Sequence, residues 1–434
     1  MDRYGLICRS FYENPDVTQR ELASILNLSL GTVNKLLGDC LEEAFLMTDM
    51  DTGKYLLTEQ GLKYLEQFKV DGAVITAAGF GSRFVPLTFE TPKGLLEVFG
   101  ERMIERQIKQ LHEAGITDIT IIVGYLKEKF EYLIDKYQVK LLYNPEYATK
   151  NNLATIYHAR ELFRGRNMYL LVSDNWIRNN MYHKYECGAW YSSVYMDGET
   201  SEWCLSSNKK GRITSVQVGG HDSWVMYGPA FLSRDFSNQL IPLIEEAYHQ
   251  PGTEQWYWEQ VVVDHIKELD FSMNCQPADQ VYEFENLEEL RLFDPKYQNH
   301  SDNAAMQLVA HVFNVKEEAI HNIRCLKSGM TNQSFLFELD GKHYICRIPG
   351  PGTEFLINRK EEEAVYRRSH RLALPNIFCI LTEKPATRSP QYYEGARNAD
   401  AKNPQEMAAV HGDAAEAASF RRDGSAHVPH PGTD

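Results

Sequence analysis

One group of residues in the sequence has types and a spacing that suit phosphate chemistry. Residues 79–83 read Gly-Phe-Gly-Ser-Arg and directly follow an apolar run, residues 73–78, while Lys93 stands in the later segment Thr-Pro-Lys-Gly. Glycine lets backbone amides close on a bound group, because no Cβ stands in the way. A strand, a glycine-rich turn and the positive charges of Arg83 and Lys93 together predict a phosphate-binding site.

A carboxylate at the end of a later apolar run belongs to the same chemistry. Asp174 follows residues 168–172 in the sequence Ser-Asp-Asn. Magnesium prefers carboxylate oxygens together with phosphate oxygens and water, so Asp174 is the first candidate ligand of a magnesium ion. A helix N-cap is the alternative role for this residue.

The elements that must position these residues alternate between strand and helix from residue 70 to about 295. The expected strands are 73–78, 119–123, 139–143 and 168–172, and the expected helices are 103–114, 127–136 and 153–163. Such alternation predicts an α/β domain with a parallel sheet covered on both faces. Ligands in these sheets bind at the carboxyl ends of the strands, so the glycine-rich loop and Asp174 should share one site.

Residues 1–69 form a separate unit with a helix, a tight turn and a second helix. Thr18 is the expected N-cap of the first helix, and Glu21 completes a capping box. A second helix over 29–37 and a two-stranded wing within 45–58 follow. The segment resembles a winged helix-turn-helix domain of bacterial regulators.

Weak or no DNA binding is expected from this first unit. It contains seven lysines and arginines against eleven aspartates and glutamates, and its proposed recognition helix carries one lysine, Lys35. Phosphate contacts supply most of the affinity for DNA, and few are available here. A dimerisation or packing module is an equal alternative.

Several motifs, in order along the chain, carry a family resemblance. AAGFGSRF followed by TPKGLL resembles the signature of sugar-nucleotide pyrophosphorylases and related nucleotidyltransferases. With MIERQIKQLHEAGI, IIVGYLKEKFEYL, NNLATIYHAR and VSDNW, most of residues 70–293 resembles bacterial CTP:phosphocholine cytidylyltransferases. The resemblance implies a Rossmann-like nucleotide-diphospho-sugar transferase fold, a Mg²⁺ cofactor, and the transfer of CMP from CTP to phosphocholine.

The resemblance also implies roles for individual residues. Lys93, Arg83 and Asp174 are the implied catalytic residues. The implied nucleotide-binding residues are Ala77, Ala78, Gly79, Gly81, Ser82, Arg83, Asn152 and Thr155. Helix capping is the alternative role for one of the polar side chains at the start of the helix that contains Thr155.

The second metal ligand implied by the family departs from the family pattern. The family's carboxylate is an aspartate after a Tyr-Trp pair, and here that position is Glu259. Glu259 is therefore the expected ligand beside Asp174, and Asp264, a helical turn later, is the alternative. Lys127 is expected to contact the acceptor or the leaving group. The alternative is that it is a solvated residue at the start of a helix.

Aromatic residues suggest the acceptor. A quaternary ammonium binds over aromatic faces, and all six tryptophans of the chain lie between residues 176 and 258. Glu202 and Trp203 are the favoured substrate-binding pair, with Tyr182 and Trp256 as further candidates. Packing in the core or in a lid is the alternative role for several of them. A sugar phosphate, phosphoethanolamine or an aminophosphonate is the alternative acceptor.

The bulk composition limits the function classes. The chain has 434 residues, which predicts two or three domains. Its net charge of -15 argues against a chain-wide nucleic-acid or anionic-membrane role. The eight cysteines form no C-x-x-C pair, which fits reduced thiols in a cytoplasmic protein. A homo-oligomer is compatible with these features, and a metabolite-sensing DNA-binding regulator is the non-enzymatic alternative.

Residues 304–434 resemble part of a bacterial choline kinase. The segments LKSGMTNQSFLF and YICRIPG resemble its N-terminal lobe. The His-Gly-Asp at 411–413 lacks the asparagine of a kinase catalytic loop, so we expect the kinase to be inactive. Family-like islands lie between unrelated flanks, 367–390 and 410–434, which suggests a shifted reading frame. Much of the last sixty or so residues is therefore expected to be poorly ordered.

Overall fold

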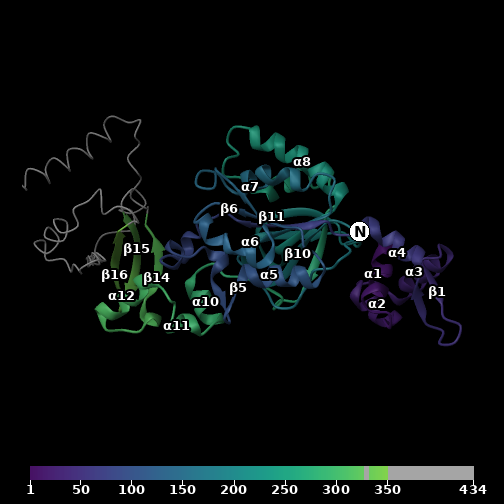
Figure 1. Ribbon diagram of the computed structural model, residues 1–434, viewed down its shortest axis with the longest axis horizontal. Helices are drawn as coiled ribbons and strands as arrows, with labels where there is room; N and C mark the ends of the chain where they lie inside the picture. The colour runs from purple at the N-terminus through teal and green to yellow at the C-terminus, as the bar shows by residue number, and fades with distance from the viewer. Residues whose placement is uncertain (327–331, 350–434) are drawn as a thin grey trace, which may run out of the picture. The chain divides into compact units, whose positions relative to one another are not determined.

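The computed structural model describes residues 1–326 and 332–349, drawn as ribbons in Figure 1. The chain divides into two compact units, Met1–Gln307 and a second that begins at Leu308. Both domains predicted within the first 295 residues belong to the first unit. Within the described ranges, no helix is both long enough and apolar enough to cross a membrane.

The first domain is a helix-turn-helix followed by a hairpin. Its elements are α1 (Arg3–Glu13), α2 (Gln19–Ile25), α3 (Leu30–Glu42), β1 (Leu46–Thr48), β2 (Tyr55–Leu57) and α4 (Glu59–Leu65). Thr18 caps α2 and forms the predicted capping box with Glu21. β1 and β2 pair antiparallel as the predicted wing. Helix α1 was not predicted, and its Ile7 and Phe11 are buried in the core of this domain.

A seven-stranded sheet forms the centre of the second domain. Its strands, in spatial order, are β12 (Ser272–Gln276), β10 (Trp190–Ser207), β11 (Ile213–Leu232), β8 (Met168–Val172), β3 (Gly72–Ala77), β6 (Ile119–Val123) and β7 (Lys140–Tyr143). The last four of these run parallel to one another. β3 comes first along the chain and lies between β6 and β8, so its carboxyl end is a topological switch point.

The β10–β11 hairpin corrects the prediction of an all-parallel sheet. β10 and β11 pair antiparallel, and β11 also pairs antiparallel with β8. The two strands span 18 and 20 residues, and much of each lies at exposed or half-buried positions. Because such stretches have no continuous apolar run, they lack the signal that marked the buried parallel strands. The sheet is therefore mixed, and its parallel half has the expected Rossmann-like α/β arrangement.

Helices cover both faces of this sheet (Figure 1). One face packs against α7 (Asn152–Ala159), α8 (Arg234–His249) and α9 (Trp258–Asp264), and the other against α5 (Met103–Glu113) and α6 (Tyr132–Tyr137). Successive residues of β3 alternate between the faces, as a strand requires. Val74 joins the cluster that contains Ile156 of α7, whereas Ile75 joins Ile108 of α5.

The remaining elements are short. They are β4 (Glu97–Val98), β5 (Glu101–Arg102), β9 (Asn175–Ile177), β13 (Val281–Glu283), α10 (Leu287–Phe293), α11 (Lys296–Asn299), α12 (Ala304–Phe313), β14 (His321–Cys325), β15 (Asn332–Leu339) and β16 (Lys342–Pro349). The last three strands form an antiparallel sheet in the second unit. The resemblance to a kinase lobe stays a prediction, and the segments 367–390 and 410–434 lie outside the described residues.

Candidate active site

The carboxyl ends of β3 and β8 open onto a cavity of about 270 Å³. Thr76 of β3 pairs with Val172 of β8 at this end, so the loops that follow the two strands are neighbours. As predicted, residues from both loops share one site. The predicted residues that line it are Ala77, Ala78, Gly79, Gly81, Lys93, Asn152, Thr155, Asp174 and Glu259.

Lys93 and Asp174 form an ion pair in this cavity. The Lys93 ammonium lies 2.6 Å from Asp174 Oδ2, and the two side chains are only 12% and 15% exposed. The other carboxylate oxygen of Asp174, Oδ1, is buried and has no hydrogen-bond partner among the described residues. A buried oxygen without a partner is costly, so Asp174 is prepared to bind a cation or a donor.

Gly94 allows the lysine to approach Asp174 closely. A Cβ at residue 94 would lie 2.5 Å from Ser173 Oγ and 2.6 Å from Ser173 Cβ. Gly94 belongs to the 3₁₀ turn Lys93–Leu95, which therefore packs directly against the residue before Asp174. Any larger residue at this position would push the turn, and with it Lys93, away from Asp174.

The glycine-rich loop bends sharply at Gly81. Its φ of 66° lies in the left-handed region, which glycine adopts without strain. The Gly81 carbonyl accepts a hydrogen bond from Thr88 Oγ1 at 3.0 Å. After this bend, Ser82 and Arg83 do not line the cavity, and Arg83 instead forms an ion pair with Glu285. The predicted contacts of Ser82 and Arg83 with a nucleotide are thus not preformed.

Asn152 and Thr155 line the cavity but already have protein partners. Asn152 Oδ1 accepts from the backbone N–H of Trp258 at 2.8 Å, and its Nδ2 donates to Glu259 at 3.4 Å. Thr155 Oγ1 accepts from Asn144 Nδ2 at 3.0 Å. The N-cap of α7 is the preceding residue, Asn151, so capping explains neither side chain. Asn152 ties α7 to the start of α9, and base recognition by these two residues stays a prediction.

Glu259 lies in the cavity, whereas Asp264 does not. Tyr191 donates its hydroxyl to Glu259 at 3.1 Å. Burial raises the pKa of Glu259 to about 7, although hydrogen bonds from Tyr191 and Asn152 act against the shift. Asp264 is exposed and accepts a hydrogen bond from Gln260 at 2.9 Å. The structure therefore favours Glu259 over Asp264 as the second carboxylate of the site.

These donors suit a magnesium ion that takes further ligands from its substrate. The described residues contain no cluster of three or more histidine, cysteine or acidic side chains that would hold a metal alone. Asp174 and Glu259 line one cavity, and Asp174 has an unpartnered oxygen. Magnesium commonly uses one or two carboxylates and completes its shell with phosphate oxygens and water, so the pair fits it.

Sequence reasoning missed an acidic residue that does not line the cavity but feels the charges of Asp174 and Lys93, namely Glu283. It lies at the end of β13 and accepts a hydrogen bond from Asn175 Nδ2 at 3.3 Å. Burial and the charge of Asp174 raise its pKa to about 7, while Lys93 opposes the shift. Glu283 is brought next to Asn175 because β13 pairs with β9, which lies more than a hundred residues earlier in the chain. No local pattern in the sequence indicates that pairing.

Of the predicted aromatic residues, Trp203 has an exposed aromatic neighbour. Its ring centre lies 6.3 Å from that of Tyr257, at an interplanar angle of 75°, and Tyr257 is 48% exposed. Trp203 does not line the cavity itself. Tyr257 occupies the N-cap position of α9, immediately before the cavity residues Trp258 and Glu259. Glu202 is close enough to add to the raised pKa of Glu283. Trp256 packs against the core and does not line the cavity.

Two of the predicted substrate-binding residues lie elsewhere. Tyr182 is 5% exposed and packs edge-on against Tyr169, at 5.0 Å between ring centres. It belongs to the core and does not line the cavity, so its predicted contact with the acceptor stays a prediction. The Lys127 ammonium lies 4.2 Å from the centre of the Tyr143 ring, outside the cavity. Lys127 begins a 3₁₀ turn, Lys127–Phe130, where a continuous helix was expected.

Comparison with known proteins relates the fold to a chemistry. A family model for nucleotidyl transferases matches residues 72–186, and a model for winged helix-turn-helix DNA-binding domains matches residues 7–43. Choline-phosphate cytidylyltransferase of Streptococcus pneumoniae is 34% identical over 229 residues, which is 53% of this chain and 99% of that protein.

A second relative and a solved structure match a similar share of the chain. 2-Aminoethylphosphonate cytidylyltransferase of Lancefieldella rimae is 36% identical over 227 residues, 52% of this chain and 92% of that protein. The solved structure of CTP:phosphocholine cytidylyltransferase from Streptococcus pneumoniae matches with a TM-score of 0.50 at 35% identity. The match covers 52% of this chain and 97% of that one.

Proposed function

Because the chain belongs to the nucleotidyl transferase family and to its cytidylyltransferase branch, we propose that it transfers CMP from CTP to phosphocholine. The products are CDP-choline and pyrophosphate. The observation that carries the proposal is the Lys93–Asp174 pair in a cavity at the switch point of the sheet, bordered by Glu259. Ligands bind at such switch points in open α/β sheets.

The reaction requires the chain to align two anions. A phosphate oxygen of phosphocholine attacks the α-phosphorus of CTP, the bond to the β-phosphate breaks, and pyrophosphate leaves. The Lys93 ammonium supplies fixed positive charge to the phosphate that is transferred. The space beside Gly79 is open, since a Cβ built there would meet no atom within 4 Å. Phosphates can therefore approach the backbone amides of the loop around Gly79 and Gly81.

Asp174 and Glu259 are the residues that would hold Mg²⁺ in this reaction. The ion would neutralise part of the triphosphate charge when bound. Lys93 holds one oxygen of Asp174 and leaves the other free. Burial raises the pKa of Glu259. A cation bound beside it would lower that pKa again and so favour the charged carboxylate.

The acceptor assignment rests on the aromatic pair. Trp203 and Tyr257 present two rings beside the end of α9 that carries Glu259. A trimethylammonium group binds over such faces, and the nearby carboxylates of Glu202 and Glu283 add attraction. Phosphocholine carries both this cation and the attacking phosphate, which matches an aromatic border next to a phosphate-binding cavity.

A 2-aminoethylphosphonate acceptor is the second candidate. The relative from Lancefieldella rimae is named for it and is as similar to this chain as the choline-phosphate enzyme. A primary ammonium would depend on hydrogen bonds to Glu202 or Glu283 more than on the rings. Pyrophosphate release measured with CTP and UTP, against phosphocholine, phosphoethanolamine, 2-aminoethylphosphonate and a sugar phosphate, separates these functions. Fastest release with a sugar phosphate would overturn both candidates.

Replacement of Trp203 tests the acceptor directly. Trp203→Ala should lose about 1–2 kcal/mol of phosphocholine binding, or roughly ten- to thirtyfold in affinity. Calorimetric titration in the presence of a non-hydrolysable CTP analogue measures this loss. CTP affinity should barely change. Trp224→Ala is the matched control, because Trp224 lies on the same hairpin and packs against the same core. Equal losses for CTP and phosphocholine would mean that Trp203 only packs.

A further inference from the structure

A second lysine lines the cavity, and neither the sequence motifs nor the reaction described above uses it. The basic residues that line the cavity, among those the structure describes, are Lys93 and Lys150. Lys93 is engaged by Asp174. Lys150 comes from a different segment, directly before Asn151, the N-cap of α7. A nucleoside triphosphate carries several negative charges, so the position of this second ammonium matters.

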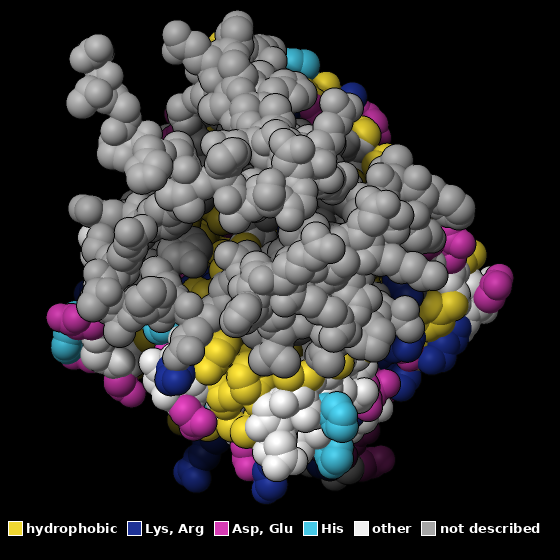
Figure 2. Space-filling model, turned by 90° about the vertical axis from the view of Figure 1, so that its left-hand side faces the viewer, with side chains coloured by type: hydrophobic (Ala, Val, Ile, Leu, Met, Phe, Trp, Pro, Cys, Tyr) yellow, Lys and Arg dark blue, Asp and Glu magenta, His cyan; other side chains and the backbone are white. Residues whose placement is uncertain are grey.

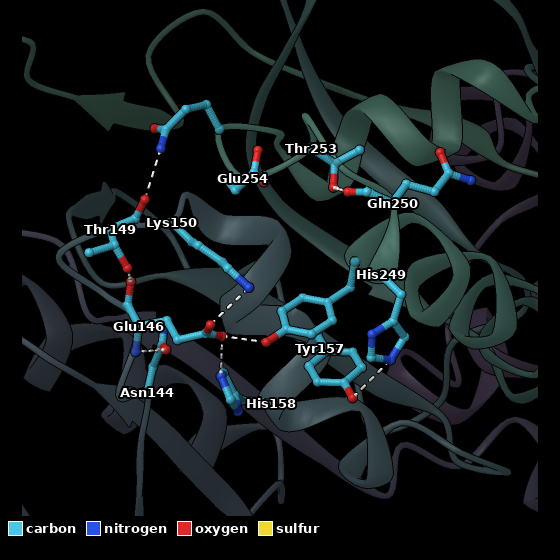
Figure 3. A network of polar contacts seen from close by, with 12 residues as sticks. Asn144, Glu146, Thr149, Lys150, Tyr157, His158, His249, Gln250, Thr253 and Glu254 are labelled. Atoms are coloured by element: carbon cyan, nitrogen blue, oxygen red, sulfur yellow. Dashed lines mark hydrogen bonds and ion pairs between the residues drawn. The ribbon is translucent and has the colours of Figure 1, made fainter.

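Lys150 is held by a compact polar network (Figure 3). Its ammonium lies 2.8 Å from Glu146 Oε1 and 4.0 Å from the centre of the Tyr248 ring. Glu146 Oε2 accepts two further hydrogen bonds, from Tyr248 Oη at 2.6 Å and from His158 Nε2 at 2.9 Å. Glu146 is therefore bound by donors from three directions.

Glu146 stays charged but does not depend on Lys150 alone. Partial burial acts to raise its pKa, yet hydrogen bonds from Lys150, Tyr248 and His158 hold it at about 2. If the lysine turns away, the tyrosine and histidine still satisfy the carboxylate. Releasing Lys150 then costs only the free energy of one partly exposed ion pair, and such pairs contribute little to stability.

The residues on either side of Lys150 are hydrogen-bonded to the turn before α9. Asn151 N–H donates to the Glu254 carbonyl at 2.8 Å, and Gln255 Nε2 donates to the Thr149 carbonyl at 2.9 Å. These bonds hold the residues on either side of Lys150 against the turn before α9. The flexible side chain, 24% exposed, is thus presented to the cavity from a rigid base.

We propose that Lys150 contacts the nucleotide: its ammonium leaves Glu146 and donates hydrogen bonds to the phosphate oxygens of CTP. Glu146 is a positioning residue, which holds the lysine beside the cavity until the nucleotide enters. The proposal rests on the proposed use of CTP and adds a second cation to the cavity that Lys93 lines. It involves no covalent step by either residue.

Nucleotide titration without an acceptor tests the contact. Lys150→Met should weaken CTP binding about ten- to hundredfold, the range for a hydrogen bond to a charged group. The affinity for cytidine should change less than about twofold, because cytidine has no phosphate. Lys150→Arg should keep most of the CTP affinity. The control is Lys140→Met, since Lys140 is exposed and pairs with Asp118 away from the cavity.

Each outcome of this titration decides something. Unchanged CTP affinity in Lys150→Met, or equal losses for CTP and cytidine, would overturn the phosphate contact. Failure of the wild type to bind CTP would count against the proposed function as well. Failure of phosphocholine as an acceptor would leave this experiment untouched, because no acceptor is present.

A second variant separates positioning from simple structural support. Glu146→Gln removes the anion that competes with the phosphates for Lys150, so CTP affinity should rise, by about two- to fivefold, the size of a weak ion pair. The melting temperature should fall, because Tyr248 and His158 lose their charged acceptor. A fall in both quantities would mean that Glu146 only supports the fold, and would overturn its positioning role.

Discussion

At the scale of single residues, the two lysines of the cavity are each paired with a carboxylate before a nucleotide enters. Lys93 is paired with Asp174, and Lys150 with Glu146. Each lysine thus stands ready beside a carboxylate that keeps it in place. For Lys93, such preorganisation lowers the cost of arranging charge around the transferring phosphate, which is where enzymes of this type gain most of their rate.

Removal of Lys93 should affect turnover far more than folding. Lys93→Ala takes a preorganised charge from the transferred phosphate and should lower kcat by about a hundred- to a thousandfold. Steady-state pyrophosphate release measures the loss, and circular dichroism checks that the variant is folded. Lys140→Ala, which breaks an exposed ion pair outside the cavity, should keep wild-type turnover. Near-normal turnover in folded Lys93→Ala would contradict a phosphate role.

The two carboxylates of the cavity should be needed for magnesium-dependent activity. Asp174→Asn should abolish that activity, because a neutral amide is a poor ligand for magnesium. Glu259→Gln should cripple it, and Asp264→Asn should be silent, since Asp264 is exposed outside the cavity. Activity measured across a magnesium titration compares the three variants. A silent Glu259→Gln beside a crippled Asp264→Asn would transfer the ligand role to Asp264.

At the scale of elements, buried strands were predictable and long-range pairings were not. The expected strands 119–123 and 168–172 match β6 and β8 residue for residue, because strands buried on both faces are continuous apolar runs. The capping box at Thr18 was equally local. The β10–β11 hairpin and the return of β13 to β9 depend on contacts between distant segments. Lys93 and Asp174 were therefore predictable from the sequence, whereas Glu283 and Lys150 were not.

The 3₁₀ turn that carries Lys93 gives a prediction at this scale. Gly94→Ala places a Cβ 2.5 Å from Ser173 Oγ, so the turn must shift. The shift should separate Lys93 from Asp174 and lower kcat at least tenfold, with a smaller effect on the melting temperature. Gly38→Ala in α3 is the control, because its Cβ would meet nothing within 4 Å. Wild-type kcat in Gly94→Ala would show that the turn tolerates a side chain.

At the scale of the whole molecule, the first domain is joined to the strand that ends at the active site. Arg9 of α1 pairs with Glu186 at 2.7 Å, and Glu186 also accepts from the hydroxyl of Tyr169 on β8 at 2.6 Å. Tyr185 is 1% exposed in the hydrophobic cluster of the first domain. These contacts favour the packing role for that domain, and weak or no DNA binding stays a prediction.

On the part of the surface that Figure 2 shows clear of grey atoms, acidic and basic side chains lie interspersed beside a patch of hydrophobic ones. The first domain is judged by its own charges. In the first domain, Lys35 and Asn34 are exposed on α3, the proposed recognition helix. A single lysine there supplies few phosphate contacts.

Breaking the Arg9–Glu186 pair should destabilise the first unit strongly. Arg9→Met leaves Glu186 buried without its cation, with side chains that are only 13% and 4% exposed in the wild type, and should cost about 3–5 kcal/mol. Urea denaturation measures the free energy of unfolding.

Lys54→Met is the matched control, because it breaks an equally short pair, with Asp16 at 2.6 Å, whose side chains are 59% and 75% exposed. That loss should be about 0–1 kcal/mol. The double variant Arg9→Met, Glu186→Met should recover much of the stability, since it leaves no unpaired buried charge. Equal effects of Arg9→Met and Lys54→Met would mean that the first domain is not held to the enzyme by this pair.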